Sequence, residues 1–386
     1  MTYVAEQSQK KDMAAGRQLE VKIVDCDVHP SSTIEGLVDY VPEPWRSRYF
    51  RRYPAEVESG GARIYMPSTA TRVDALPAHG GPEGSDPALM DKQLIQELGV
   101  DYAILIPLFP RLKISDPAFE TAMCATCNNW QADTWLSKFN WHGRYRGSIR
   151  VCPFDPEGAI REIEKWAGHP FMVQVSMFPE SPAPYGQPQF HPILETAARH
   201  GLPIALHIIK QPGMRALTPV GFPSYWIETF AQHPLLYMGH LNSFVFDGAF
   251  QKFPELRVVC VEGGFSWLPP FLWRLDQYWN ALGPEVPDVK RRPSEYIREH
   301  VRLTTQPLEE GFHLKSMQRM MTWMDAERLL LLATDYPHYD MDVPEWTAAR
   351  LPQAMRNSIL RDNAIELYRL PRTRARDSLD GSPLNG

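Results

Sequence analysis

The chain has 386 residues, with 40 Lys or Arg against 46 Asp or Glu, and a formal net charge of -6. Hydrophobic residues (44%) and charged residues (22%) occur in the proportions of an ordinary globular protein, which excludes collagen-like, fibrous and disordered chains. The mild acidity argues against nucleic-acid or membrane partners, and no apolar stretch approaches the roughly 20 residues of a membrane-spanning helix. With only five scattered cysteines, an odd number, we expect a cytoplasmic protein.

Eight short runs, each almost continuously apolar, predict parallel strands that are buried on both faces. In chain order they are residues 21–28, 101–107, 146–151, 171–177, 203–209, 256–262, 300–305 and 328–335. Helical patterns precede the second to the fifth of these strands, at residues 91–99, 118–139, 157–168 and 191–201. This alternation, with a count of eight, favours a closed (β/α)8 TIM barrel over a doubly wound sheet.

The predicted barrel accounts for most of the chain as one domain over residues 20–370. Residues 1–19 and 371–386 are polar and without periodicity, so we expect mobile tails. Residues 30–91 are too many for a simple crossover and predict an insertion after the first strand, on the face where barrel active sites lie. The 36 prolines, nearly twice the usual share of about 5%, are expected to stiffen loops around that face.

Acidic and histidine side chains stand at the ends of four predicted strands. Asp27 and His29 share one face of the first strand, with Asp25 a step deeper. His207, Glu262 and Asp335 close three later strands. A structural role, such as a hydrogen-bonded core histidine, would explain any of them alone. In a barrel, however, all four strand ends meet at one face, so together they predict a catalytic metal site.

The same residues resemble those of the amidohydrolase superfamily. The resemblance rests on the D-x-D-x-H pattern at 25–29, His207, the segment FQKFPELRVVCVEGGFSWLPPFLWRLD at 250–276 and the ending ATDYPH at 333–338. It spans about residues 21–370 and is strongest to the amidohydrolase-related group that includes aminocarboxymuconate semialdehyde decarboxylase and aromatic-acid decarboxylases. Members of that group supply the expectations that follow.

The resemblance implies a ligand set for one divalent ion. Its members are Asp27, His29, His207 and Asp335, and Asp335 would also pass a proton to the substrate. Zn²⁺ is the expected ion, with Mn²⁺ or Fe²⁺ possible. A single ion is favoured because no lysine ends the fourth strand to bridge a second one.

Arg274 matches an arginine that reaches a substrate carboxylate in relatives, sometimes across a dimer interface, which implies a homodimer. A surface salt bridge of Arg274 with Asp276 is the alternative. Trp267 is a candidate substrate-binding residue, and it would form an aromatic wall with Trp273, Tyr336 and Tyr65.

One departure from the family pattern concerns the reaction. Where relatives have His-Gly-Gly after the sixth strand, this chain has Glu262, Gly263 and Gly264. The missing imidazole's role would fall to Glu262 itself, to His240 on the preceding helix or to His338 beyond Asp335. His240 could instead be hydrogen-bonded within the fold.

Two reactions fit this set of residues. We expect a non-oxidative decarboxylase (carboxy-lyase) that acts on an aromatic or unsaturated carboxylic acid. The alternative is a metal-dependent hydrolase that uses metal-activated water on an amide, lactone or vinylogous acyl substrate. A scaffold protein without activity is disfavoured, because drift would be expected to erase metal-type residues at so many strand ends.

Overall fold

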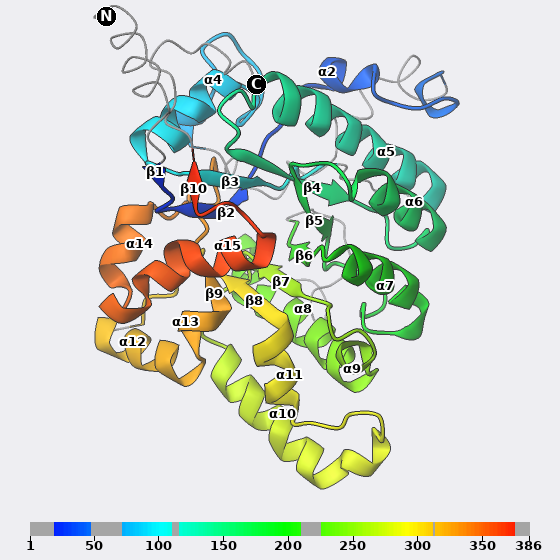
Figure 1. Ribbon diagram of the computed structural model, residues 1–386, viewed down its shortest axis with the longest axis vertical. Coiled ribbons are helices and arrows are strands. Elements are labelled where there is room, and N and C mark those ends of the chain that lie inside the picture. The colour runs from blue at the N-terminus through cyan, green and yellow to red at the C-terminus, as the bar shows by residue number, and fades with distance from the viewer. Residues whose placement is uncertain (1–18, 48–71, 110–115, 210–224, 312, 375–386) are drawn as a thin grey trace, which may run out of the picture.

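The computed structural model describes residues 19–47, 72–109, 116–209, 225–311 and 313–374, and a ring of parallel strands lies at its centre (Figure 1). Eight strands are hydrogen-bonded in chain order. They are β2 (Val24–Val28), β3 (Tyr102–Leu105), β4 (Tyr145–Arg150), β5 (Met172–Met177), β6 (Ile204–His207), β7 (Val258–Val261), β8 (Val301–Thr304) and β9 (Leu330–Leu331). Each matches one of the eight runs predicted from the sequence.

The ring closes where the chain beyond β9 runs beside β2. Val28 and Tyr336 form a parallel bridge, and the amide of Asp335 donates to the carbonyl of Asp27 over 3.1 Å. The strand expected over 328–335 is regular for only two residues. Its first two positions end the helix Ala326–Leu329, and residues 332–334 lead without regular strand pairing to Asp335, whose φ of 64° is left-handed. The predicted (β/α)8 barrel is confirmed, with its last strand much shorter than expected.

Helices cover the outer face of the barrel, and the four that the sequence predicted before β3 to β6 are all present. They are α4 (Pro87–Met90) continued by the π-helical η4 (Asp91–Glu97), α5 (Pro117–Trp130) continued by the π-helical η5 (Gln131–Lys138), α6 (Pro156–Trp166), and α7 (His191–His200). The later helices are α8 (Trp226–Phe246), α9 (Ala249–Lys252), α10 (Leu268–Leu282), α11 (Pro293–His300), α12 (Leu314–Trp323), α13 (Ala326–Leu329), α14 (Pro344–Arg350) and α15 (Asn363–Tyr368). Short 3-10 turns are η6 (Pro188–Phe190), η7 (Gly283–Glu285) and η8 (Gln353–Met355), and the π-helical η9 (Ser358–Asp362) precedes α15.

Prolines mark the starts of many of these helices. Proline occupies one of the first two positions of α4, α5, α6, α7, α10, α11 and α14. At α5, Asp116 accepts hydrogen bonds from the amides of Ala118 and Phe119, and Pro117 supplies a preset φ. The expectation that prolines mainly stiffen loops is therefore incomplete, since several of them fix where helices begin.

Alternate residues of the strands face the barrel interior. A Cβ added at Gly147 of β4 would come within 2.7 Å of side chains of η5, so this position faces the helices. Arg146, Ser148 and Arg150 on the same strand therefore face inward.

One helix covers the amino-terminal end of the barrel. Ala364, Ile365 and Tyr368 of α15 share a buried cluster with Val24 and Tyr102, the first residues of β2 and β3. The carboxyl ends of the strands lie at the opposite end, which leaves that end for the site.

The two ends of the domain meet in a small sheet. β1 (Leu19–Glu20) pairs antiparallel with β10 (Thr373–Arg374), and Arg374 Nε donates to Asp101 Oδ1 over 2.6 Å. Residue 19 and residues 373–374 lie in segments that were expected to be mobile tails, so that expectation is wrong for them. The rest of both tails lies outside the described residues.

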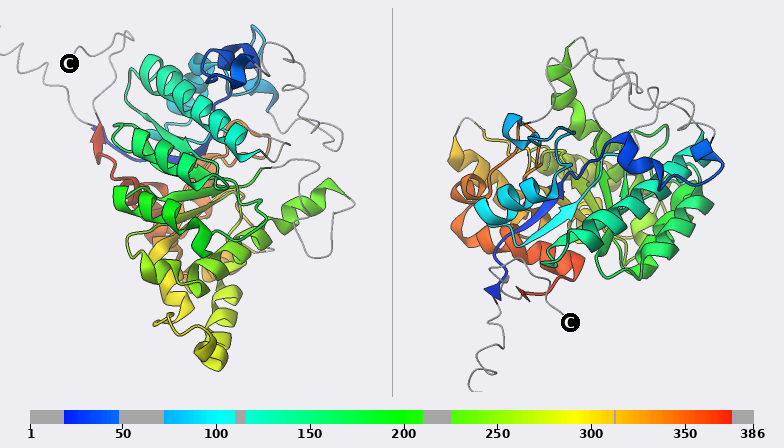
Figure 2. Two further views of the ribbon diagram at one scale, coloured as in Figure 1. Left: turned by 90° about the vertical axis from the view of Figure 1, so that its right-hand side faces the viewer. Right: turned by 90° about the horizontal axis from the view of Figure 1, so that it is seen from above.

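The segment expected as an insertion, 30–91, is described in part. It contains α2 (Ile34–Val38), the turn η3 (Val73–Ala75) and α4, while Tyr65 lies outside the described residues. On the other side of the molecule, α10 projects away from the barrel (Figures 1 and 2). Among the described helices, none combines the length and apolar character needed to cross a membrane.

Candidate metal centre

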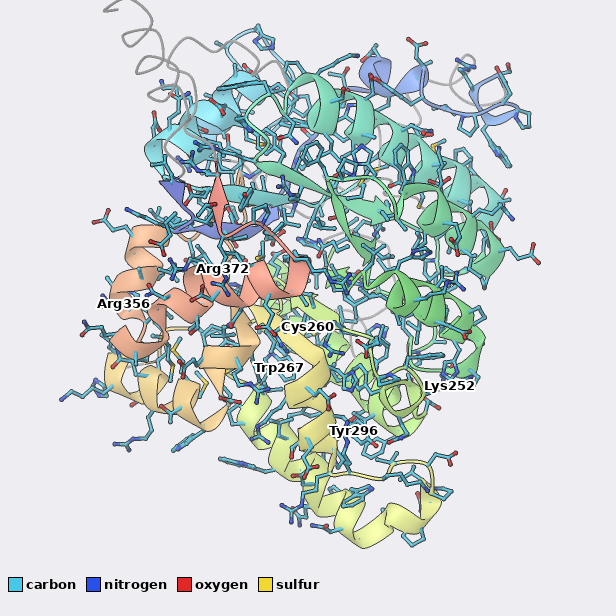
Figure 3. All side chains as sticks on the ribbon, in the orientation of Figure 1. Lys252, Cys260, Trp267, Tyr296, Arg356 and Arg372 are labelled. Carbon is cyan, nitrogen blue, oxygen red and sulfur yellow. The ribbon has the colours of Figure 1, made fainter. Side chains whose placement is uncertain are left out.

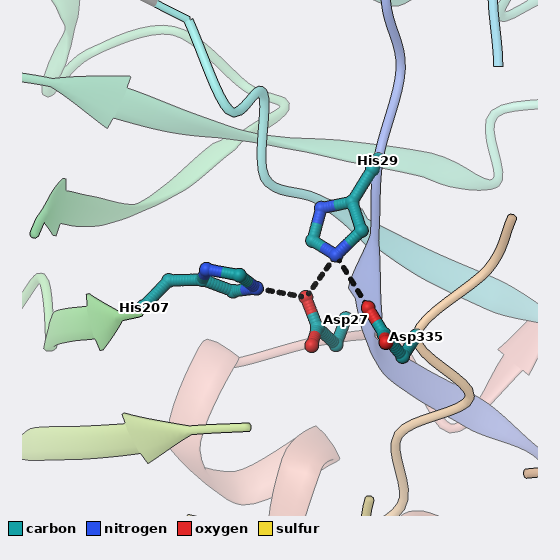
Figure 4. Close-up of side chains that lie close together, drawn as sticks. All are labelled: Asp27, His29, His207 and Asp335. Carbon is teal, nitrogen blue, oxygen red and sulfur yellow. Dashed lines mark hydrogen bonds and ion pairs between the residues drawn. The ribbon is translucent and has the colours of Figure 1, made fainter. Parts of the chain in front are cut away.

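Four side chains converge at the carboxyl ends of the strands (Figure 4). Asp27 and His29 come from β2 and the residue after it, His207 ends β6, and Asp335 follows β9. One ligand atom from each lies within 4.8 Å of the others, and all four residues are buried. We call this group the acid–histidine cluster. It contains the four residues that the sequence predicted as metal ligands.

Backbone hydrogen bonds fix the direction of both imidazoles. His29 Nδ1 is 2.8 Å from the carbonyl of Ile106, and His207 Nδ1 bonds to the carbonyl of Ile208. A carbonyl can only accept, so each Nδ1 carries the proton and each Nε2 faces the cluster. His29 Nε2 lies 2.8 Å from Asp335 Oδ1 and 3.3 Å from Asp27 Oδ1.

The cluster fits a divalent metal ion. His207 Nε2 is buried and has no hydrogen-bond partner among the described residues, although it lies 3.4 Å from Asp27 Oδ1. A buried acceptor without a donor is costly, and a cation would satisfy it. Two imidazole nitrogens and two carboxylates match the ligands of Zn²⁺, Mn²⁺ and Fe²⁺.

The charges in the cluster are consistent with a cation. Burial disfavours a charged His29, but the nearby carboxylates outweigh it and raise the pKa of His29 to about 9. Burial also disfavours a charged Asp335, yet the charge of His338 and the hydrogen bonds from both histidines hold its pKa well below the usual range. Burial, with the charge of His29, lowers the pKa of His207 to about 3, so this imidazole is neutral. Ionised carboxylates and a neutral His207 are in the forms that bind metals, and His29 would release its proton on binding an ion.

Neighbouring side chains hold Asp335 in place. His338 Nδ1 lies 2.6 Å from Asp335 Oδ1, and Gln306 Nε2 donates to Oδ2 over 3.2 Å. Asp25 accepts from the amide and the hydroxyl of Thr334, at 2.9 and 2.6 Å, and so ties β2 to the turn that presents Asp335. Gln306 was not singled out from the sequence, although its position just after the predicted strand 300–305 was a signal for it.

Glu262 lies at the edge of the cluster. Its Oε2 is 3.6 Å from His207 Nε2, and the side chain is buried. Its φ is 60°, a left-handed conformation that costs about 1–3 kcal/mol in a non-glycine residue. Glu262 is therefore near enough to take part in the chemistry, as the sequence analysis suggested.

Both ring nitrogens of His240 form hydrogen bonds with backbone groups instead of with the cluster. Its Nδ1 accepts from the amide of Tyr185 over 3.1 Å, and its Nε2 lies 2.8 Å from the carbonyl of Pro179. Burial lowers its pKa to about 4. Because backbone groups bond to both nitrogens, His240 holds the loop after β5, which favours the alternative of a histidine hydrogen-bonded within the fold.

Arg274 and Trp267, the residues expected to bind substrate, lie on or beside α10 and do not line the cavity beside the cluster. Arg274 is exposed on the projecting α10, and Asp276 accepts from Ser294 rather than from Arg274. Trp267, labelled in Figure 3, precedes α10, and its indole N–H donates to the carbonyls of Gly263 and Gly264. Trp267 thus braces the turn after Glu262, so neither residue lines the site within this chain.

Trp273 and Tyr336, which were expected to form an aromatic wall of the site, do not line the cavity. Trp273 is 58% exposed and packs beside Trp323 of α12, because its helix points away from the barrel. Tyr336 is buried, and its hydroxyl donates to Gln93 Oε1 over 2.7 Å.

A cavity of about 210 Å³ adjoins the cluster instead. His29 and His338 line it, together with the flat side chains of Phe109 and Trp130. The insertion contributes to its rim; the remaining lining residues are Pro30, Ser31, Ser32, Leu37, Pro82, Glu83, Leu108 and Pro337. Of the three candidates for the missing imidazole's role, His338 is the one that both lines the cavity and bonds to the cluster. Trp130 was hidden in a predicted helix, with nothing in the sequence to separate it from core residues.

An eight-stranded barrel with a divalent-metal site at the carboxyl ends of its strands defines a metal-binding (β/α)8 protein. The model of the amidohydrolase family matches residues 24–370. The chain belongs to this family.

Individual proteins resemble the chain less closely. The 2-amino-3-carboxymuconate-6-semialdehyde decarboxylase of Dictyostelium discoideum is 26% identical over 152 residues, which span 39% of this chain and 39% of that protein. The 5-carboxyvanillate decarboxylase of Sphingomonas paucimobilis has a similar structure, with a TM-score of 0.65, 21% identity, and coverage of 91% of this chain and 100% of that one. A dihydroxybenzoic acid decarboxylase from Polaromonas sp., with bound manganese and 2-nitroresorcinol, has a TM-score of 0.61 at 20% identity, covering 91% and 97% of the two chains.

Proposed function

We propose that this protein is a metal-dependent, non-oxidative decarboxylase of an aromatic or unsaturated carboxylic acid. The observation that carries the proposal is the cavity beside the acid–histidine cluster, whose walls include Phe109 and Trp130. Flat apolar walls suit a planar ring, and the cluster at one end suits an acidic group. The names of the compared decarboxylases favour the same reaction.

Asp27, His29, His207 and Asp335 would hold one divalent ion. A bound divalent ion supplies positive charge that attracts a carboxylate and stabilises the negative charge developing as CO₂ leaves. The donor set suited Zn²⁺ at the sequence level, but the manganese in the Polaromonas structure favours Mn²⁺.

His338 is positioned to handle the proton. When the carbon–carboxyl bond breaks, its electron pair stays on the substrate carbon, and a proton replaces CO₂ there. Asp335 was the expected donor, but His29, His338 and Gln306 already bond to its carboxylate. His338 lines the cavity and bonds to Asp335 over 2.6 Å, so we assign proton delivery to His338 and its orientation to Asp335.

The same proposal includes a homodimer in the cytoplasm. Arg274, Trp273 and Tyr278 are all exposed on the projecting α10, where a second copy could cover them and receive Arg274 near its own site. All five cysteines are free and buried, as suits a reducing compartment.

The test is a substrate panel with metal analysis. Protein loaded with Mn²⁺ or Zn²⁺ is incubated with hydroxybenzoates and muconate-type acids, and released CO₂ is measured. A parallel panel of amides, esters and lactones reports hydrolysis. We expect about one ion per chain and CO₂ from at least one planar acid, abolished by chelation and restored by the ion. Hydrolysis without CO₂ release would replace the proposal with the hydrolase alternative, and light scattering on the same sample tests the dimer.

A further inference from the structure

A buried arginine stands at the carboxyl end of β4, two strands away from His207. Arg150 ends β4, faces the interior and is 1% exposed. Adjacent strands lie about 4.8 Å apart, so β4 and β6 are separated by roughly 10 Å, comparable to a substituted benzene ring with a contact at each end. The register supports this placement, since Arg150 pairs with Ser176 of β5 and Ser176 pairs with Ala205, two residues before His207.

The Arg150 guanidinium has few partners inside the protein. Its single hydrogen bond among the described side chains runs from Nη1 to Ser176 Oγ at 3.5 Å, the upper limit for such a bond. Its Nε is buried without a partner, and no carboxylate in the described chain lies within ion-pair distance. The guanidinium stacks on Phe178 at 3.3 Å from the ring centre, which leaves its N–H edge for another group.

Two carboxyl groups lie near enough to feel the charge of Arg150 without forming an ion pair. They are Glu120 and Glu180, and burial raises the pKa of each, that of Glu180 to about 8. Glu180 Oε1 accepts from the amide of Ile209 over 2.8 Å, while Oε2 is buried with no partner among the described residues. Neither carboxyl group forms a hydrogen bond or an ion pair with the guanidinium of Arg150 among the described residues.

A second arginine on the same strand makes the contrast clear. Arg146 also faces inward and also stacks on aromatic rings, those of Tyr102 and Phe171. Its Nη1, however, donates to the carbonyls of Gly143 and Tyr145, at 2.8 and 2.9 Å. Arg146 is thus satisfied by the fold, whereas Arg150 is not. A buried unpaired charge costs several kcal/mol, which an arriving anion would offset.

We propose that Arg150 forms an anion-binding subsite that receives a second acidic group of the substrate, while the first acidic group lies at the acid–histidine cluster. The substrate class is therefore a planar diacid. Neutral Glu180, beside the subsite, can donate a hydrogen bond to the same anion through its unpartnered Oε2. Arg150 lies in the same chain as the cluster, whereas Arg274, exposed on α10, would come from a second copy of the chain. The subsite rests on the proposed function only in assuming that the cluster binds the first acidic group.

The test compares two acids that differ by one carboxylate. Binding of 2-hydroxybenzoate and of 4-hydroxybenzene-1,3-dicarboxylate to the metal-loaded protein is measured by calorimetry. We expect the diacid to bind at least about tenfold more tightly than the monoacid. In Arg150→Met the ratio of diacid to monoacid affinity should fall to about one. In Arg150→Lys the ratio should take an intermediate value, because lysine keeps the positive charge but cannot donate two parallel hydrogen bonds as a guanidinium does. Arg146→Met is the matched control and should keep the wild-type ratio.

The ratio is measured on one sample, so partial loss of fold or metal affects both acids alike. Equal affinities in the wild type, or an unchanged ratio in Arg150→Met, would overturn the subsite. Acetate that stabilises the wild type but not Arg150→Met, without any preference for the diacid, would mean that a free anion binds there and would also overturn the assignment. If the ratio depends on Arg150 but no acid releases CO₂, the subsite stands and the proposed reaction fails.

Discussion

Polar side chains inside the barrel differ between its amino-terminal half and its mouth. In the deeper half, Ser148 Oγ donates to the carbonyl of Leu105, Gln174 Nε2 donates to Ser148, and the Tyr368 hydroxyl donates to Gln174 Oε1, over 2.6–2.9 Å. At the mouth, His207 Nε2, Arg150 Nε and Glu180 Oε2 are buried without partners among the described residues. Natural folds satisfy most buried polar groups, so we interpret these three exceptions at the mouth as groups kept for ligands.

The largest expected effect is a loss of CO₂ release, and metal content should distinguish the roles of Asp335 and His338 in it. Asp335→Asn removes a charged metal ligand, so we expect weaker metal binding. The rate of CO₂ release should fall by at least about a thousandfold, the size of loss typical when a group that stabilises the transition-state charge is removed. His338→Gln should keep the metal but lower kcat by about a hundredfold or more, because it removes the proton donor. Elemental analysis and kinetics on the acid found in the panel measure both.

Asp288→Asn, on an exposed loop position, is the control and should change neither quantity. His338→Gln with full kcat would assign the proton to another group, and metal-free His338→Gln would make His338 a ligand.

A smaller effect concerns stability at the mouth. The pKa of Glu180 is raised by burial to about 8, so the folded state binds its proton more tightly than the unfolded state. This contribution is complete below about pH 4.5 and is lost as pH rises through about 8. Between pH 5.5 and 8.5, the free energy of unfolding of the wild type should therefore fall by about 2–3 kcal/mol relative to that of Glu180→Gln.

Urea denaturation at the two pH values measures this difference. Glu195→Gln, on the exposed face of α7, should follow the wild type at both. Parallel pH dependence for wild type and Glu180→Gln would show that Glu180 is ionised in the fold and would weaken the contrast between the two halves.

The smallest effect belongs to the deeper half. Tyr368→Phe removes the hydrogen bond to Gln174 and leaves a buried amide oxygen without a donor, so we expect a loss of about 1–2 kcal/mol in unfolding free energy. Metal content and kcat should not change, because the network lies at the other end of the barrel. Glu195→Gln, on the exposed face of α7, serves again as the control. A changed kcat would mean that the two halves are coupled rather than separate.

Much of the candidate site could be predicted because parallel topology brings strand ends together. Asp27, His29, His207 and Asp335 each end an apolar run, so locating the runs was enough to locate the cluster. The roles that the sequence could not decide were those that depend on the direction of a helix or on local backbone contacts. Arg274 is exposed on the projecting α10, so its predicted substrate contact requires a second copy of the chain, and backbone groups of the loop after β5 occupy both nitrogens of His240.

The sequence by itself determined the eight strands and the cluster at their ends, since continuous apolar runs form buried parallel strands and an α/β barrel aligns their carboxyl ends. Only the tertiary structure decided which polar groups lack partners. Arg146 and Arg150 are the same residue type on the same strand and face, and nothing in their spacing separates them. Carbonyls of the loop before β4 and of its first residue satisfy Arg146, whereas Phe178 and a long bond to Ser176 leave the edge of Arg150 free. Whether a buried charge is satisfied depends on neighbours from other parts of the chain, which become known only when the chain is folded.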